Sequence, residues 1–220
     1  MRIDRMEVLR YLGHKNQSID KATDRLLEEC IVEINEISKK SFVFNIYDIE
    51  KEEDKIALKG TNLIFESKDL YIHLYSSDKC ALLAATLGLE VDRRIAYYSK
   101  MNLTKGIIMD ACASTAIEAL CDEVQEGIGE KAKEEGRYIT ARYSPGYGDL
   151  PITHQKDIVE VLRAYSQIGL TVNEASIMLP RKSVTALIGW QREEHTAKGD
   201  KCENCKEKNC LYRKCGDIDG

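Results

Sequence analysis

Residues 80–88 read Cys-Ala-Leu-Leu-Ala-Ala-Thr-Leu-Gly, a continuous apolar run that ends at a glycine. Such a run is typical of a buried strand, because a strand covered on both faces needs no alternation of apolar and polar residues. Residues 42–47 read Phe-Val-Phe-Asn-Ile-Tyr, and this β-branched and aromatic segment predicts a second strand. The two segments place β-structure in the first half of the chain.

Helical segments surround these strands. Residues 4–12 predict a short amphipathic helix, Ser18 is the expected N-cap of a longer helix that ends near Ile37, and helices dominate from Glu90 to about Glu135. The other predicted segments are a charged turn at 50–55, weaker strands at 56–58 and 63–65, a short helix at 69–75, a strand at 138–143, a helix around 158–168 and a strand at 183–190. This mixture of hairpin-like strands and clustered helices predicts an α+β fold with a mixed or antiparallel sheet.

The composition is that of an ordinary globular protein. The 220 residues are 43% hydrophobic and 31% charged, which suits one domain, or one domain with a small appendage. The net charge of -5 argues against a general nucleic-acid binder, although a local basic patch remains compatible with it. Residues 1–12 do not resemble a signal peptide, and the longest apolar run, 107–121, is too short to cross a bilayer. We therefore expect a cytoplasmic protein that does not bind membranes.

The eight cysteines form two populations. Four stand singly among apolar residues and are expected to be small core side chains: Cys30, Cys80, Cys112 and Cys121. Four others lie together in a polar tail: Cys202, Cys205, Cys210 and Cys215. The contrast places a boundary near Lys198, between a main domain at 1–198 and a Cys-rich tail at 199–220.

The tail spacing, Cys-x2-Cys-x4-Cys-x4-Cys, predicts a metal site. Four thiolates this close together can surround one zinc ion or hold an iron–sulfur cluster, and spacing alone does not distinguish these. A disordered tail with free thiols is the structural alternative. The interspersed lysines and arginines also permit a zinc knuckle that binds nucleic acid.

A second candidate site is the hexapeptide Arg142-Tyr143-Ser144-Pro145-Gly146-Tyr147. Arginine can grip a carboxylate with two parallel hydrogen bonds, proline stiffens the backbone, and glycine permits a close approach. The tyrosines offer flat apolar faces with a polar tip. The loop would suit a ligand that carries both a carboxylate and an aromatic base. A strand that ends in a Pro-Gly turn is the structural alternative.

A polar stripe marks the helix around residues 107–124. Asp110, Ser114, Glu118 and Asp122 recur every four residues and therefore share one face of the helix. The stripe is compatible with the lining of a cleft or with a solvent-facing surface. The chain has four histidines, and their scatter (His14, His73, His154 and His195) argues against a catalytic set.

Several segments, taken in order, resemble the activation domain of vitamin B12-dependent methionine synthase. They are Thr86-Leu87-Gly88 with Asp92, the helix around Glu118, the Arg-x-x-x-Gly-Tyr loop, and Leu179-Pro180-Arg181-Lys182-Ser183-Val184-Thr185. The resemblance covers roughly residues 1–190. It implies S-adenosylmethionine binding by Glu118, Arg142, Ser144, Pro145, Gly146 and Tyr147. In this family Arg142 would hold the ligand's carboxylate and Glu118 its ammonium group, without acid–base catalysis.

The resemblance further implies that the methyl group goes to a cobalamin that another chain carries. The chain is too short for the homocysteine, folate and cobalamin modules, so it is expected to be a free-standing activation subunit of a split methionine synthase. A flavodoxin or ferredoxin would supply the electron. Two departures stand out: the family's N-terminal acidic contact has no evident counterpart, and residues 191–196 lack an aromatic pair near the ligand. Activation of another corrinoid methyltransferase and a zinc-binding interaction or nucleic-acid module are the alternatives.

Overall fold

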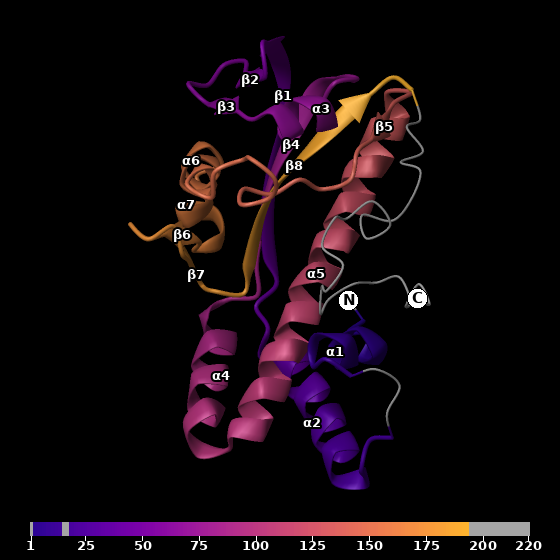
Figure 1. The fold of residues 1–220 in the computed structure, drawn as a ribbon, viewed down its shortest axis with the longest axis vertical. Helices are drawn as coiled ribbons and strands as arrows, with labels where there is room; N and C mark the ends of the chain where they lie inside the picture. The colour runs from indigo at the N-terminus through magenta and orange to yellow at the C-terminus, as the bar shows by residue number, and fades with distance from the viewer. Residues whose placement is uncertain (1, 15–17, 194–220) are drawn as a thin grey trace, which may run out of the picture.

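The computed structural model describes residues 2–14 and 18–193. Its centre is a six-stranded antiparallel sheet, with long helix α5 along one face and the short helices α6 and α7 on the other (Figure 1). The strands, in spatial order, are β3 (Ile64–Glu66), β2 (Lys55–Leu58), β1 (Ser41–Glu52), β4 (Ser77–Thr86), β8 (Ser183–Gln191) and β5 (Tyr138–Ile139). The α+β prediction is therefore confirmed.

Strand β4 is the apolar run from which the fold was predicted. It lies between β1 and β8, and the pairing with β1 runs in unbroken register from Ser41 opposite Thr86 to Asp48 opposite Lys79. Its side chains alternate between two cores: Ala81, Leu83 and Ala85 enter one, while Cys80, Leu82 and Ala84 enter the other. Burial on both faces explains why this strand is continuously apolar.

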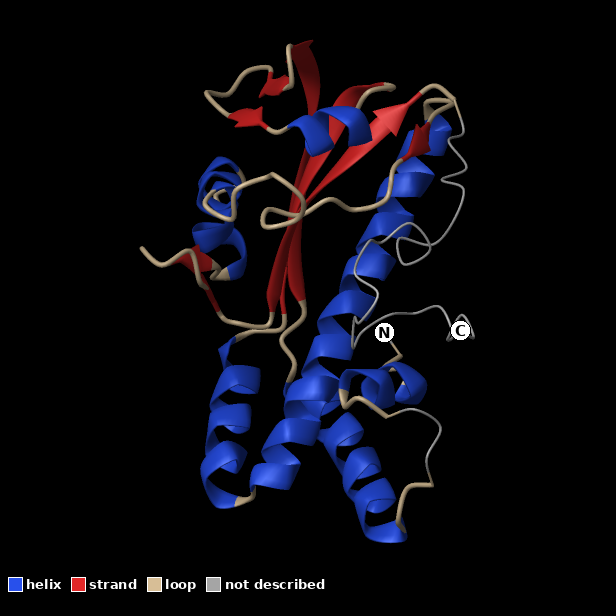
Figure 2. Ribbon diagram, viewed as in Figure 1, coloured by secondary structure: helices blue, strands red, loops and turns tan. Residues whose placement is uncertain are grey.

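Helices cover both faces of the sheet (Figure 2). The first core contains residues of the helices α1 (Arg5–Tyr11), α2 (Lys21–Ile37), α4 (Leu89–Met101) and α5 (Leu103–Glu134). The second lies under the helices α3 (Lys68–His73), α6 (His154–Val161) and α7 (Ala164–Ile168). A separate two-stranded sheet pairs β6 (Thr171–Val172) with β7 (Met178–Leu179).

The long helix α5 has 32 residues and is the frame on which the site is built. The Asn102 side chain begins it by accepting a hydrogen bond from the Lys105 amide at 3.1 Å. Near this end α5 crosses α4 closely, because a Cβ at Gly106 would come within 2.8 Å of the Ser99 amide nitrogen. Glycine at this position lets the two helix backbones approach each other.

Some element boundaries differ from the prediction. The N-cap of α2 is Asp20, not Ser18, and its carboxylate accepts hydrogen bonds from the amides of Ala22 and Thr23. Strand β1 continues through the predicted charged turn to Glu52, and only Glu53 and Asp54 form the turn, with φ values of 37° and 65°. The predicted helix around 158–168 is two short helices, which are separated at Arg163.

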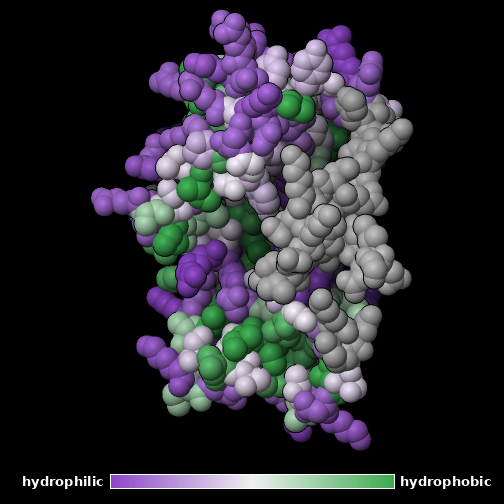
Figure 3. Space-filling model, viewed as in Figure 1, coloured by the Kyte–Doolittle hydropathy of each residue, from purple (hydrophilic) through white to green (hydrophobic). Residues whose placement is uncertain are grey.

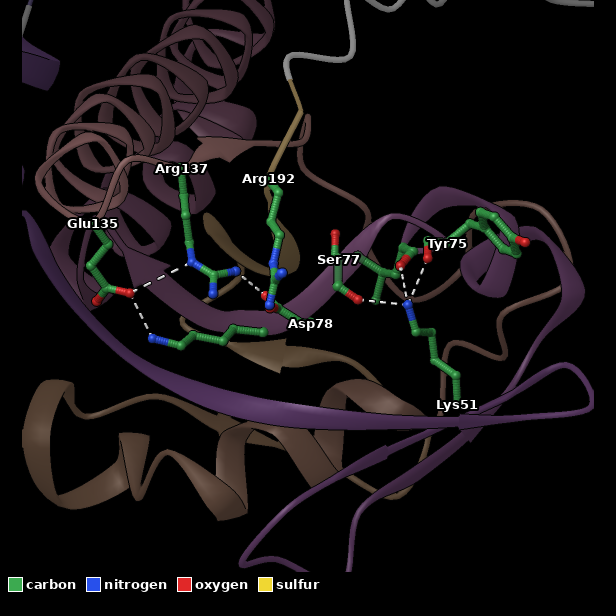
Figure 4. A network of polar contacts seen from close by, with 9 residues as sticks. Lys51, Tyr75, Ser77, Asp78, Glu135, Arg137 and Arg192 are labelled. Carbon is green, nitrogen blue, oxygen red and sulfur yellow. Dashed lines mark hydrogen bonds and ion pairs between the residues drawn. The ribbon is translucent and has the colours of Figure 1, made fainter.

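A polar network closes one end of the sheet, where β4 begins and β8 ends (Figure 4). Arg137 and Arg192 both pair with Asp78, and Lys79 Nζ lies 2.6 Å from Glu135 Oε2. Lys51 Nζ donates to the carbonyls of Tyr75 and Ser77, each at 2.6 Å. The network ties the end of α5 to β4 and β8, and therefore holds α5 in place along the sheet.

The four isolated cysteines are buried, as predicted. Burial raises the pKa of each thiol, to about 11 for Cys30 and about 12 for Cys80, Cys112 and Cys121. The thiols are therefore protonated and act as small apolar side chains. Within residues 2–14 and 18–193, no helix is both long and apolar enough to cross a membrane.

Candidate functional site

The polar stripe of α5 is flanked by two cations from distant parts of the chain. Lys182 Nζ lies 2.9 Å from Asp110 Oδ1 and 2.8 Å from Ser114 Oγ. One turn further along, Arg142 contacts Glu118 and Asp122. The stripe is therefore one side of a charged surface that α5 shares with the segments around Arg142 and Lys182.

Arg142 lies at the centre of this surface. Its Nη2 donates to Glu118 Oε2 at 3.0 Å, and its Nη1 lies 3.0 Å from Gln125 Oε1 and 2.8 Å from Asp122 Oδ1. The Arg142 side chain is 16% exposed, whereas Glu118 and Asp122 are 47% and 68% exposed. Burial alone would lower the pKa of Arg142, but the hydrogen bond with Asp122 and the neighbouring negative charges outweigh it and raise that pKa.

The chain after β5 determines where Arg142 points. Tyr143 exchanges two backbone hydrogen bonds with Leu187 of β8, at 2.9 and 2.7 Å, so this segment continues along the edge of the sheet. Successive side chains of an extended segment point to opposite faces. Arg142 therefore reaches α5, while Tyr143 packs on the other face, with its ring 5.1 Å from that of His73.

The predicted ligand loop turns sharply after Tyr143. The Gly146 amide donates to the Leu150 carbonyl at 2.8 Å, and the Tyr147 amide donates to the Ser144 carbonyl at 3.2 Å. Gly146 has a φ of 92°, which L-residues rarely adopt. Pro145 is buried, whereas the Tyr147 side chain is exposed. The turn thus presents glycine backbone and a tyrosine ring at the surface.

Asp149 anchors the far side of this loop to α3. Its carboxylate accepts hydrogen bonds from the Lys68 amide at 2.9 Å, the Asp69 amide at 3.2 Å and the Ser67 hydroxyl. The contacts with Ser67 and the two amides lower the pKa of Asp149. A carboxylate is favourable at a helix N-terminus, so this contact fixes the loop to a rigid element.

The other segments of the sequence pattern also meet in space. The Leu87 amide donates to the Lys182 carbonyl at 3.0 Å, and the Arg181 amide donates to Asp92 Oδ2 at 2.6 Å. These bonds join the end of β4, the start of α4 and the turn before β8. Lys182 is thereby positioned to contact the stripe.

A pocket of about 620 Å³ adjoins the stripe at Asp110 and Ser114. Tyr11 of α1, Ile95 of α4 and Arg181 also line it. Burial, and then the negative charge of Glu118, raise the pKa of Tyr11. Apolar side chains gather on this face low in the view, over α4 and the start of α5 (Figure 3). The pocket has the size of a small-molecule site and combines an apolar wall with a charged rim.

The structure brings Glu118 and Arg142 together and places Ser144, Pro145, Gly146 and Tyr147 in one turn, but their ligand role remains a prediction. Sequence reasoning missed Tyr11, Gln125 and Lys182 on this surface, and Asp149 at the far side of the loop. Gln125 follows Glu118 by seven residues, which places it on the same face of the helix. Lys182 lies within the segment 179–185 that carries the family resemblance. The sequence therefore contains a signal for both residues. Tyr11 belongs to the amphipathic helix predicted at 4–12, but no contact with the stripe was predicted for it.

The predicted metal site falls on Cys202, Cys205, Cys210 and Cys215, which lie outside the described residues. Among residues 2–14 and 18–193, no three His, Cys, Asp or Glu side chains are grouped as metal ligands. Two of the histidines make local contacts: His73 Nε2 lies 2.9 Å from the Ala141 carbonyl, and His154 Nδ1 lies 2.9 Å from Asp157 Oδ2.

Comparison with known proteins identifies a family. The family model described as "Vitamin B12 dependent methionine synthase, activation domain" matches residues 68–206, more than half of the chain. A solved structure, the MetH reactivation domain bound to AdoHcy, superposes with a TM-score of 0.63 over 81% of this chain and 68% of the other. The two sequences are 16% identical, so this second likeness shows the fold. A search of curated proteins gave no match.

Proposed function

This chain belongs to the family of vitamin B12-dependent methionine synthase activation domains, and we propose that it binds S-adenosylmethionine between α5 and the loop at 142–147. The observation that carries the proposal is the contact of Arg142 with Glu118, which unites two charges 24 residues apart next to the Pro-Gly turn. The structural neighbour binds AdoHcy, the demethylated product of S-adenosylmethionine, which supports the same ligand class here.

The charges suit the amino-acid part of this ligand. The ligand's carboxylate would accept two hydrogen bonds from the Arg142 guanidinium, and the ligand's ammonium would pair with the Glu118 carboxylate. The ligand would therefore replace the ion pair of Arg142 with Glu118 by two pairs, one for each residue, and would compete with Asp122 for the guanidinium. Because Glu118 is half exposed, its present contact with Arg142 is worth little and is readily exchanged.

The loop at 142–147 suits the rest of the ligand. Gly146 allows close approach to a bound group, and the exposed Tyr147 ring offers a face for an adenine base. The methyl group of a sulfonium is already activated, so this chain needs to position it and to exclude water. No proton has to move in that transfer.

We propose that the methyl acceptor is a corrinoid carried by a separate chain. Cob(II)alamin takes up one electron to give cob(I)alamin. Its cobalt then bonds to the methyl carbon while the carbon–sulfur bond breaks, which yields methylcobalamin and S-adenosylhomocysteine. A flavodoxin or ferredoxin is the proposed electron donor, and a split methionine synthase in the cytoplasm is the proposed setting. Activation of a different corrinoid methyltransferase is the second candidate.

Titration calorimetry with S-adenosylmethionine tests the ligand proposal, and Arg142→Ala is its central variant. Removing a charge-assisted bidentate contact costs on the order of 1.5–3 kcal/mol, so binding should weaken about tenfold to a hundredfold. Arg93→Ala is the matched control, because Arg93 lies on α4 with a side chain that is 69% exposed. It should bind as the wild type does.

Two results would count against the proposal. Undetectable binding by the folded wild-type chain would remove S-adenosylmethionine as the ligand. Equal affinities for the wild type and a folded Arg142→Ala variant would remove Arg142 from the site. Restoration of methylcobalamin in a mixture with the corrinoid chain and a reductant would then test the reaction itself.

A further inference from the structure

Three residues of α5 hold the tip of the Arg142 side chain, and they differ in charge. Glu118 and Asp122 are carboxylates, whereas Gln125 is an amide whose Oε1 accepts a hydrogen bond from Arg142 Nη1 at 3.0 Å. Residues separated by four and seven positions lie on one face of a helix, so all three side chains reach the same guanidinium. Of the three, Gln125 is the acceptor that carries no negative charge.

The guanidinium has enough donors to keep Gln125 when a ligand binds. Nη1 and Nη2 carry two N–H groups each. Nη1 contacts Gln125 Oε1 and, at 2.8 Å, Asp122 Oδ1, while Nη2 donates to Glu118 Oε2 at 3.0 Å. A bidentate carboxylate needs one N–H from each of two nitrogens. A ligand's carboxylate can therefore replace Asp122 on Nη1 and Glu118 on Nη2, while Gln125 keeps the second N–H of Nη1.

The burial of these side chains favours this exchange. Glu118 and Asp122 are exposed enough to be hydrated once they leave the guanidinium, so little free energy is lost when they do. Arg142 itself is mostly buried, and a buried N–H that loses its acceptor is costly. Gln125 is half-buried and continues to satisfy one such N–H throughout the exchange.

Gln125 also fixes the far end of a flexible side chain. The backbone next to Arg142 is held by the two hydrogen bonds between Tyr143 and Leu187. Beyond that point a long arginine side chain loses rotamer freedom when it binds a ligand, unless another contact has already ordered it. The hydrogen bond to Gln125 supplies such a contact from a rigid helix.

We propose that Gln125 is a positioning residue, which holds the Arg142 guanidinium in place while the ligand's carboxylate exchanges with Asp122 and Glu118. This inference rests on the proposed function, because it requires S-adenosylmethionine to bind through Arg142. A neutral acceptor suits the task, since a third carboxylate at this position would neutralise the guanidinium further and repel the carboxylate of the ligand. Gln125 therefore contributes to selection of ligands that keep a free carboxylate.

Two variants test the role by titration calorimetry, with chemical denaturation in parallel. Gln125→Glu keeps the size of the side chain and adds a charge that competes for Arg142. It should weaken S-adenosylmethionine binding about fivefold to thirtyfold, while the protein stays at least as stable as the wild type. Gln125→Leu removes the acceptor and should weaken binding about threefold to tenfold. If Gln125 only stabilised the fold, Gln125→Glu would bind as well as the wild type.

The decarboxylated analogue of S-adenosylmethionine gives a readout that a structural role would not change. This analogue keeps the ammonium, the sulfonium and the adenosine, but lacks the group that Arg142 would bind. Both variants should therefore bind it as the wild type does, or more tightly for Gln125→Glu, whose added charge attracts the cationic ligand. Glu130→Gln is the matched control: it changes the net charge by one unit on an exposed residue of α5, and should leave both affinities unchanged.

The outcomes separate this inference from the proposed function. A folded wild type that does not bind S-adenosylmethionine overturns both. If the wild type binds and Arg142→Ala loses affinity, but both Gln125 variants bind S-adenosylmethionine unchanged, only the role of Gln125 is overturned. Equal losses for S-adenosylmethionine and its decarboxylated analogue also overturn it, because Gln125 would then act through the fold and not through Arg142. A loss confined to the ligand with a carboxylate is the expected result.

Discussion

Arg142 has more than one partner on α5, and this makes the role of Glu118 testable. Glu118 and Asp122 both contact the guanidinium, but only Glu118 is proposed to meet the ligand's ammonium. A carboxylate that only paired with Arg142 would compete with the ligand's carboxylate and weaken binding. A carboxylate that contacted the ligand's ammonium would strengthen binding.

Glu118→Gln keeps the side-chain shape and removes the charge. We expect it to weaken S-adenosylmethionine binding about tenfold, since it loses one charge-assisted contact. Asp122→Asn is the matched control and should bind equally well or more tightly, because it removes a competitor for Arg142. Calorimetry on both variants decides the question: tighter binding by Glu118→Gln would show that Glu118 only competes with the ligand.

For single residues, the sequence shows which side chains are available but not which side chains they contact in the fold. The four-residue spacing correctly set Asp110, Ser114, Glu118 and Asp122 on one face, because helix geometry alone determines it. The pairing of Lys182 with Asp110 joins residues 72 positions apart in the chain, and no local pattern contains that information. Tyr11 was missed for the same reason, since its place beside α5 depends on tertiary packing.

At the scale of elements, the crossing of α4 and α5 depends on one glycine. Gly106→Ala would place its Cβ within 2.8 Å of the Ser99 backbone, so the helices would have to separate. We expect a loss of about 1–3 kcal/mol in unfolding free energy. Gly127→Ala, in the same helix, meets nothing within 4 Å and should stabilise the protein by about 0.5–1 kcal/mol.

Chemical denaturation at low protein concentration measures both variants. The comparison separates helix propensity, which favours alanine at both positions, from the steric contact, which exists only at Gly106. Equal changes in the two variants would show that the close crossing does not contribute to stability.

Glu33 joins three helices and should make stability depend on acid. Its carboxylate pairs with Arg94 of α4 and with Lys105 Nζ of α5 at 3.0 Å. Burial would raise its pKa, but the contacts with Lys105 and Arg94 outweigh this and lower it below the ordinary 4.5. A lowered folded-state pKa means that the stabilisation is complete above about pH 4.5 and is lost as pH falls through the folded-state value.

We therefore expect Glu33→Gln to be less stable than the wild type at pH 7 by about 1–3 kcal/mol. Its unfolding free energy should also change less between neutral pH and the acid range. Glu29→Gln, which removes an exposed pair with Arg25 on the same helix, is the control and should differ little from the wild type. Parallel pH profiles for wild type and Glu33→Gln would contradict this assignment.

The elements themselves were largely predictable where pattern and burial agree. The apolar run at 80–88 and the helical region from 90 to 135 appear as β4, α4 and α5, since their patterns span many residues. Strand β1 was predicted too short because its far half, Asp48–Glu52, is charged and gains its strand geometry from pairing with β2. That pairing is a tertiary contact, which local propensity does not encode.

For the whole molecule, the fold is described up to residue 193 and the family model matches up to residue 206. The four clustered cysteines of the tail need a test of their own. We propose that 1–198 is an autonomous domain and that 199–220 binds a metal. Among the described residues, the two cores extend from Ile3 to Trp190. A segment as short as the tail would need a metal to order it.

Truncation after Lys198 tests this division. The shortened chain should keep one cooperative unfolding transition and its affinity for S-adenosylmethionine, and should lose all bound metal. Elemental analysis and a visible spectrum of anaerobically purified full-length protein would distinguish zinc from iron and sulfide, since thiolate sites accept either. A Cys205→Ser variant of the full chain is the control for a direct role of the thiolates.

The possible outcomes distinguish metal binding from S-adenosylmethionine binding. Full-length protein without stoichiometric zinc or iron after anaerobic reconstitution would end the metal proposal and leave the ligand proposal intact. Loss of S-adenosylmethionine binding on truncation would instead place part of the tail in the ligand pocket, where residues 191–196 supply no aromatic pair. Cys205→Ser removes one metal ligand but keeps the segment. Normal S-adenosylmethionine binding by that variant would then show that the polypeptide of the tail, and not its metal, contributes to the ligand pocket.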